Sequence, residues 1–332
     1  MAYTAIDIVD IEQISITNHL PDLGIDNIRK EVIDGLMANP KYISSKFFYD
    51  DKGSKLFQAI TKLPEYYPTR TEKGILEEMV PKLMKDFKNR SIVELGSGDH
   101  SKISILLKAI RPENIKSIKY IPVDISQSAI KSASENLIKS FPYLTVDGLV
   151  LDFINQLELI PSDEQRLFCF LGSTLGNFNE KEANSFLKDL SSAMNSGDSF
   201  LLGLDMVKPI PILHDAYNDD QKITAEFNKN ILNVVNEIID SEIDPDNFEH
   251  KAFFNATESR IEMHLKANKK MLINFPYSNT SISINRGEYI HTENSYKFSK
   301  DRITVLEQIT NLKIQQIFTD EKNWFSIVLF EK

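Results

Sequence analysis

Between residues 90 and 205, short apolar runs alternate with segments of helical periodicity. The runs predict strands at 91–95, 118–124, 149–152, 166–171 and 199–204. Helices are expected after the first strand, where apolar residues recur at i, i+3, i+4 and i+7 from Ile103, after the potential N-cap Ser126, and over 180–195. This repeated alternation predicts an α/β fold, a doubly wound parallel sheet with helices on both faces.

A different pattern follows the fifth strand. An apolar stripe predicts one helix over 212–242, and residues 250–290 change to the period-two alternation of half-buried antiparallel strands. A helix near 300–311 and strands at 312–318 and 324–330 return to the sheet pattern. We therefore expect a sheet domain of residues 76–207 and 298–332, and a second, mixed α+β domain of residues 1–75 and 208–297. A small ligand is expected in the cleft between two such domains.

Composition narrows the class of partner. The chain has 332 residues with 42% hydrophobic and 26% charged residues, which is typical of a globular protein of about two domains. Its formal net charge of -10 disfavours nucleic acid as a partner. The single cysteine, Cys169, excludes a disulfide within the chain and indicates a reducing compartment. The N-terminus lacks the pattern of a signal peptide, and no apolar run approaches about 20 residues, so we expect a cytoplasmic protein without a membrane span.

A glycine turn separates the first predicted strand from its helix. Gly96 and Gly98 allow close approach of a ligand to the backbone, and the helix N-terminus offers free N–H groups. The third glycine of a dinucleotide fingerprint is replaced by Ser101, which disfavours NAD or FAD.

Acidic residues follow the next two strands. Asp124 ends the second strand, where a carboxylate can accept both ribose hydroxyls. Asp152 follows the third strand beside Phe153, a pair suited to the amino group and the ring of adenine. Each acid alone is more often a solvated strand end. The ordered set, with Glu94 just before the glycine turn, favours the cofactor S-adenosyl-L-methionine (AdoMet) and a methyltransferase.

Five strings of residues carry a family resemblance over the chain from about residue 30 to its end. They are ELGSG at 94–98, LGSTLGN at 171–177, LPEYYPTR at 63–70, FYDD at 48–51 and IEMHL at 261–265. Together they resemble the histidine Nα-methyltransferases of ergothioneine biosynthesis. The resemblance implies a Rossmann-like class I methyltransferase sheet and AdoMet-dependent trimethylation of the α-amino group of L-histidine, which gives hercynine. It also implies a small-molecule partner, and we expect a monomer.

The resemblance assigns residues to two sets. The cofactor-binding positions are Gly96, Gly98, Lys102, Asp124, Asp152 and Phe153. The positions that hold the amino and carboxylate groups of the substrate, and so carry the catalysis, are Tyr66, Asn177 and Tyr217. Glu293 and Ser295 match positions that bond the imidazole nitrogens, and Met263 and Tyr49 match the rest of the side-chain pocket.

These residue types suit the chemistry. Methyl transfer from a sulfonium requires a neutral amine held in line, and tyrosine hydroxyls and an amide hold it without adding a charge. Glu293 and Ser295, two apart, face the same side of a strand, so each can bond one ring nitrogen. A carboxylate left unpaired by Phe or Leu would cost roughly 3–5 kcal/mol, which favours histidine.

Each residue also has a structural explanation. Tyr66 and Tyr217 are also explained as aromatic residues of the core, and Met263 is also explained as a residue that fills the core. Asn177 has capping-box spacing with Glu180. A pair such as Glu293 and Ser295 also occurs on solvated edge strands.

Other functions remain open. The main alternative is N-methylation of another amine, such as tryptophan or a prenylated tryptophan; a nicotinamide oxidoreductase and a catalytically silent AdoMet-binding protein are further alternatives. The six histidines have no metal-ligand spacing, and no metal is expected.

Overall fold

The computed structural model describes residues 13–21 and 24–332. The described chain divides into two compact units. The sheet unit contains residues 13–21, 70–206 and 298–332, and the insertion unit contains residues 24–69 and 207–297.

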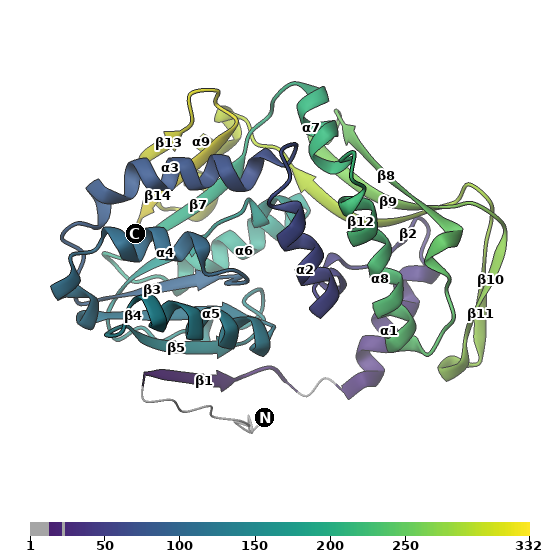
Figure 1. The fold of residues 1–332 in the computed structure, drawn as a ribbon, viewed down its shortest axis with the longest axis horizontal. Coiled ribbons are helices and arrows are strands. Elements are labelled where there is room, and N and C mark those ends of the chain that lie inside the picture. The colour runs from purple at the N-terminus through teal and green to yellow at the C-terminus, as the bar shows by residue number, and fades with distance from the viewer. Residues whose placement is uncertain (1–12, 22–23) are drawn as a thin grey trace. The chain divides into compact units, whose positions relative to one another are not determined.

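An eight-stranded sheet forms the centre of the sheet unit (Figure 1), in the order β1-β5-β4-β3-β6-β7-β14-β13. The strands are β1 (Ile14–Asn18), β3 (Arg90–Leu95), β4 (Ile118–Asp124), β5 (Thr145–Val150), β6 (Gln165–Phe170), β7 (Ser199–Asp205), β13 (Lys313–Thr319) and β14 (Phe325–Glu331). All neighbours from β1 to β7 run parallel, whereas β14 is antiparallel to both β7 and β13. The predicted doubly wound α/β sheet is thus confirmed, with a closing antiparallel hairpin.

Helices cover both faces because the central strands are apolar on both sides. The helices of the unit are α3 (Tyr67–Met84, whose first residues belong to the insertion unit), α4 (Ser101–Ala109), α5 (Gln127–Ser140), α6 (Glu180–Ala193) and α9 (Lys300–Thr310), with short 3-10 turns η2 (Pro112–Ser117), η3 (Leu157–Leu159) and η4 (Thr174–Asn177). One core joins apolar residues of α3, α4 and α5 to one side of the sheet and includes Leu167 and Cys169 of β6. Phe170 faces the other side and lies 5.0 Å, between ring centroids, from Phe186 of α6.

The insertion unit combines helices with antiparallel strands. Its helices are α1 (Gly24–Met37), α2 (Asp51–Ile60), α7 (Ile210–Tyr217) and α8 (Ile223–Ile239), with 3-10 turns η1 (Ser45–Phe48), η5 (Pro245–Asn247) and η6 (Pro276–Ser278). A four-stranded sheet has the order β2 (Lys41–Tyr42), β12 (Tyr289–Tyr296), β9 (Arg260–Ala267) and β8 (Phe248–Asn255). A separate hairpin pairs β10 (Met271–Phe275) with β11 (Thr280–Ile284). The period-two pattern of residues 250–290 correctly indicated antiparallel strands.

Two sequence expectations about boundaries were wrong. Residues 14–18, expected in the second domain, form β1 and pair with β5 in the sheet unit, and residues 70–75 also belong to that unit. The helix expected over 212–242 is two helices, because the chain turns between Tyr217 and Ile223. There the Asp219 carboxylate accepts hydrogen bonds from the N–H groups of Ile223 and Thr224, both at 2.9 Å, and so caps the second helix.

Candidate active site

The glycine turn joins the ends of β3 and β4. Gly96 has a φ of +72°, and its N–H donates to the carbonyl of Val123 at 2.8 Å. The N–H of Gly98 donates to Oδ2 of Asp124 at 3.3 Å. A left-handed φ favours glycine because a Cβ would be strained there. The conformation of the backbone therefore favours glycine at the first predicted cofactor position.

Asp124 ends β4, as the sequence predicted. Its Oδ1 accepts from the N–H of Ser126 at 2.9 Å, while its Oδ2 accepts from Gly98. Burial raises the pKa of this carboxyl, and the backbone hydrogen bonds oppose that rise. Each carboxylate oxygen has two lone pairs, so Asp124 retains acceptor capacity for the hydroxyls of a ribose.

Asp152 and Phe153 lie in the turn that follows β5. The Asp152 carboxylate accepts from the N–H of Ile154 at 3.0 Å and from Nδ2 of Asn155 at 2.7 Å. The ring of Phe153 packs against Phe170 and lies beside the glycine turn, since a Cβ placed on Gly96 would be 4.0 Å from its Cε1. The aromatic ring and the glycine turn thus share one end of the sheet unit.

A buried acid lies directly before the glycine turn. Glu94 accepts a hydrogen bond from the hydroxyl of Tyr120. Burial raises its pKa to about 8, against the lowering effects of that hydrogen bond and of the charge on Lys102. The neighbouring Ser97 has a buried hydroxyl oxygen without a hydrogen-bond partner in the described parts of the chain. An unsatisfied hydroxyl in this turn fits a polar ligand such as AdoMet.

Lys102, a predicted cofactor residue, takes part in an ion pair. Its Nζ lies 2.7 Å from Oε2 of Glu72, a side chain of α3 that is 0% exposed. The Oε1 atom of Glu72 accepts from the N–H of Gly172 at 2.7 Å. Glu72 therefore joins α4 to the start of the segment 172–177. The sequence reasoning missed Glu72, although an acid within the apolar face of a helix is a signal that could have found it.

Asn177 ends η4, and two residues separate it from the start of α6. The predicted capping box with Glu180 is wrong: Asn179 caps α6 and forms the box with Glu182. Both asparagines precede a glutamate by three residues, and the later pair matches the observed helix start. Among residues 13–21 and 24–332, the Asn177 side chain has no hydrogen-bond partner, so its amide can hold a ligand.

In the insertion unit, a row of aromatic rings contains three predicted residues. Ring centroids are 5.9 Å apart for Tyr49 and Phe57, 6.3 Å for Phe57 and Tyr66, and 6.3 Å for Tyr66 and Tyr217, all in edge-on geometry. Edge-to-face packing of this kind fixes the rings in place. Phe57 was not predicted; a Phe within a helix carries no sequence signal that separates pocket from core.

A β-bulge orients Glu293 and Ser295, the two residues predicted to bond the imidazole nitrogens. In β12, His291 pairs with His264 of β9, whereas Glu293 pairs with Met263, so the register shifts at Thr292. The extra residue turns Glu293 to the Met263 face and leaves His291 on the opposite face. The buried Thr292 hydroxyl holds this bulge, because its single proton lies between two acceptors, the side-chain oxygen of Asn228 at 2.7 Å and the Met263 carbonyl at 3.0 Å.

The Met263 face of the strands carries the predicted pocket residues. Ser295 follows Glu293 by two positions, and its Oγ accepts from the hydroxyl of Tyr217 at 2.7 Å. Burial raises the pKa of Glu293 to about 7, and the charge of Lys297 opposes that rise. The insertion unit thus brings together Tyr66, Tyr217, Met263, Glu293 and Ser295, while Asn177 and the cofactor residues belong to the sheet unit.

The opposite face of the same strands has a structural network. His264 lies 3.0 Å, through Nε2, from Oε2 of Glu262, and its ring stacks on Phe253 with centroids 5.2 Å apart. Burial alone would raise the pKa of Glu262, but hydrogen bonds from Asn255, Arg260 and His264 hold it at about 2. This face therefore supports β9 and β12 from behind.

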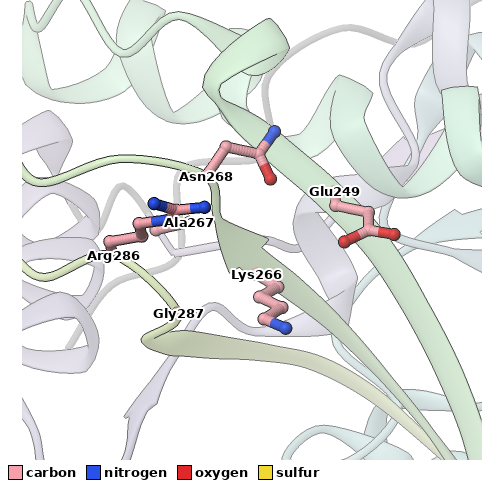
Figure 2. Close-up of a pocket in the computed structure, with 6 residues that line it drawn as sticks. All are labelled: Glu249, Lys266, Ala267, Asn268, Arg286 and Gly287. Atoms are coloured by element: carbon pink, nitrogen blue, oxygen red, sulfur yellow. The ribbon is translucent and has the colours of Figure 1, made fainter.

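An open recess of about 550 Å³ lies elsewhere in the insertion unit (Figure 2). Its lining residues are Glu249, Lys266, Ala267, Asn268, Arg286 and Gly287. None of the predicted site residues lines it. It is wide and polar, without the converging hydroxyl and aromatic groups of the Glu293 face.

A family model decides the relationship of this chain to known proteins. The model for the AdoMet-dependent, histidine-specific methyltransferases matches residues 28–332. The chain belongs to this family. It is an AdoMet-dependent methyltransferase with a Rossmann-like sheet, and the residues of the glycine turn fit that cofactor.

Curated relatives agree over nearly the full chain. The histidine N-alpha-methyltransferase of Mycobacterium tuberculosis is 36% identical, covering 96% of this chain and 100% of the relative. That of Mycolicibacterium smegmatis is 37% identical, covering 95% and 98%. Ergothioneine biosynthesis protein 1 of Neurospora crassa is 30% identical over 70% of this chain, which corresponds to 26% of that longer protein. Within residues 13–21 and 24–332, no helix is both long and apolar enough to cross a membrane.

Proposed function

We propose that this methyltransferase acts on L-histidine and transfers three methyl groups to its α-amino nitrogen, which gives hercynine for ergothioneine biosynthesis. One observation carries the choice of substrate: Glu293, with a pKa of about 7, lies opposite Met263 and two residues before Ser295 on one face of β12. A carboxylate in such surroundings requires a partner with an N–H group.

The cofactor side of the site is proposed as follows. Gly96 and Gly98 would let the cofactor approach the backbone, Asp124 would accept the ribose hydroxyls, and Asp152 with Phe153 would contact the adenine. AdoMet, when bound, supplies an electrophilic methyl group on a sulfonium. We propose that Lys102 borders this region as the partner of Glu72 rather than as a free cation.

The substrate side is proposed to hold the amino acid by both ends. The hydroxyl of Tyr66 can donate to the α-carboxylate. The hydroxyl oxygen of Tyr217, whose proton is donated to Ser295, can accept from the α-amino group. Asn177 can bond either group without a charge that would oppose the sulfonium. A nucleophilic amine must first lose its proton, and neutral partners of this kind favour the uncharged form. Tyr49 and Met263 would enclose the ring.

The residues of the Met263 face favour imidazole over indole. An indole ring has an N–H group but no ring nitrogen that accepts, so it would offer no acceptor to the proton of the Ser295 hydroxyl. Its larger ring would also press against Met263. We further propose a cytoplasmic monomer with a small-molecule substrate and no nucleic-acid or membrane partner. The net charge of -10 and the single buried free cysteine support this part of the proposal.

The test is a screen of the common amino acids with AdoMet, read by mass spectrometry. We expect histidine to become heavier by three methyl groups, all on the α-nitrogen by fragmentation. Glu293→Ala should lose this activity, whereas Glu258→Ala, which removes an exposed glutamate of the same unit, should keep it. Unmodified histidine together with consumption of tryptophan would refute the proposal.

A further inference from the structure

A buried lysine lies beside the two proposed imidazole-binding residues. Lys297, 1% exposed, directly follows β12, and its backbone N–H donates to the carbonyl of Ser259 at 2.8 Å. This continues the strand by one residue, so Glu293, Ser295 and Lys297 alternate onto the same face. The Nζ atom of Lys297 lies 2.7 Å from Oγ of Ser295 and 3.2 Å from the hydroxyl oxygen of Tyr217.

The chemistry of the three groups orders their hydrogen bonds. An ammonium group can only donate, so both hydroxyl oxygens accept from Lys297. The phenol of Tyr217 is more acidic than an aliphatic hydroxyl, and it donates to Oγ of Ser295 at 2.7 Å. Ser295 Oγ therefore accepts two hydrogen bonds, which use both of its lone pairs. Its own proton is left to donate outside this cluster.

The neighbouring acid supplies the opposite function. Glu293 carries a carboxylate on the same face, two residues before Ser295. Burial raises the pKa of this carboxyl, and the positive charge of Lys297 opposes that rise. The charge of Lys297 therefore favours the ionised carboxylate, which can only accept hydrogen bonds. One lysine thus acts on both proposed imidazole-binding groups, in opposite senses.

We propose that Lys297 is a positioning residue that makes Ser295 a donor and Glu293 an acceptor, so that the pocket selects a neutral imidazole ring. This inference rests on the proposed function. A neutral imidazole has one N–H group and one lone pair and satisfies both groups at once. An imidazolium ring would direct a second N–H group at the Ser295 donor, and a phenyl ring would leave both groups unpaired.

Replacement of Lys297 by methionine removes the donor that fixes this order. The Ser295 hydroxyl can then turn its proton to Tyr217 and no longer has to donate to a ring. We expect Lys297→Met to lose the preference for a ring nitrogen that accepts, while Lys297→Arg, which keeps a permanent donor, retains part of it. The effect should appear in the affinity for the ring and not in binding of S-adenosylhomocysteine.

The experiment is calorimetry with S-adenosylhomocysteine present and three kinds of ligand. L-histidine is the reference. The 4-thiazolyl and 5-thiazolyl analogues of alanine carry an accepting ring nitrogen at either imidazole position and no N–H group, and 2-thienylalanine has no ring nitrogen. In the wild type, we expect one thiazolyl isomer to bind about three- to tenfold more tightly than the thienyl analogue. In Lys297→Met, that ratio should fall to about one.

A matched control separates this effect from loss of any buried lysine. Lys208, 7% exposed in the same unit, has its Nζ 2.8 Å from the hydroxyl of Tyr67. Lys208→Met should lower the melting temperature but keep the thiazolyl preference. If Lys297→Met does not fold, Ser295→Ala provides the test, because it removes the donor itself and must abolish the preference.

The outcomes distinguish the two proposals. A wild-type protein that leaves histidine unmethylated with AdoMet refutes the proposed function and this inference with it. A wild type that methylates histidine but binds the thiazolyl and thienyl analogues equally refutes the inference alone. An unchanged preference in folded Lys297→Met, or in Ser295→Ala, refutes it too.

Discussion

Replacement of Glu293 by glutamine should make the protein more stable and a worse binder of histidine. The carboxyl of Glu293 has its pKa raised by burial from an ordinary value of 4.5 to about 7. The unfolded chain thus releases this proton near pH 4.5, while the folded protein keeps it until about pH 7. Between these values the folded state binds more protons, so the free energy of unfolding falls as the pH rises.

The magnitude follows from the shift. One pKa unit corresponds to about 1.36 kcal/mol, so the full penalty above pH 7 is about 3 kcal/mol. The side chain is partly exposed, and solvent screening reduces this to about 2 kcal/mol. Glu293→Gln has the same shape and does not ionise. We expect the free energy of unfolding of Glu293→Gln to exceed that of the wild type by about 2 kcal/mol at pH 8 and by less than about 1 kcal/mol at pH 5.

The assay is urea denaturation at both pH values, paired with calorimetry of histidine binding at pH 8. Histidine affinity should fall about tenfold, because a neutral amide is a weaker acceptor than a carboxylate. Glu262→Gln is the control on the other face of the sheet. The pKa of Glu262 is held at about 2, so its loss should destabilise the protein at neutral pH. An equal gain for Glu293→Gln at pH 5 and pH 8 would show that the gain does not come from ionisation of the carboxyl, and no gain at either pH would show that the carboxylate is solvated; both results contradict our account.

Three further predictions concern the sheet unit. In calorimetry, Asp124→Ala should show no binding of S-adenosylhomocysteine, whereas the control Asp163→Ala, at an exposed position, should bind it with the affinity of the wild type. Tight binding by Asp124→Ala would place the ribose elsewhere. Glu72→Gln breaks the buried ion pair with Lys102 and should lower the unfolding free energy by about 2–4 kcal/mol, and an unchanged denaturation midpoint would rule out that role. Gly172→Ala should lower the free energy of unfolding by about 1–2 kcal/mol, because the φ of Gly172 is +81° and the added Cβ would lie 2.9 Å from Nζ of Lys102. The control Gly74→Ala, in helix α3, adds a Cβ that meets nothing within 4 Å and should raise the free energy of unfolding. Equal effects of the two alanine substitutions in denaturation would contradict this explanation.

The central sheet was predictable because its strands are continuous apolar runs that end in polar turns. Residues 14–18 were assigned to the other domain because a short strand of alternating pattern has no signal for its partner, which lies about 130 residues away in β5. The break between α7 and α8 was missed because it contains neither glycine nor proline. The polar run of Asn218, Asp219 and Asp220 was the available signal, and Asp219 is the capping residue.

The arrangement of the candidate cofactor residues in space was predictable where one short motif carries it. The glycine turn, Asp124 and Phe153 lie close together in the structure because consecutive parallel strands end at one edge of the sheet. Glu72 and Lys297 were missed because their partners are distant in sequence: Glu72 bonds Gly172, and Lys297 bonds Tyr217. The bulge that turns Glu293 away from His291 also has no sequence signal.

The most direct test of the account is a crystal structure with S-adenosylhomocysteine and L-histidine bound together. We expect one imidazole nitrogen within hydrogen-bond distance of the Glu293 carboxylate and the other within reach of the Ser295 hydroxyl, with the ribose on Asp124. An imidazole ring bound away from β12, or a Glu293 side chain directed into bulk water, would contradict the account.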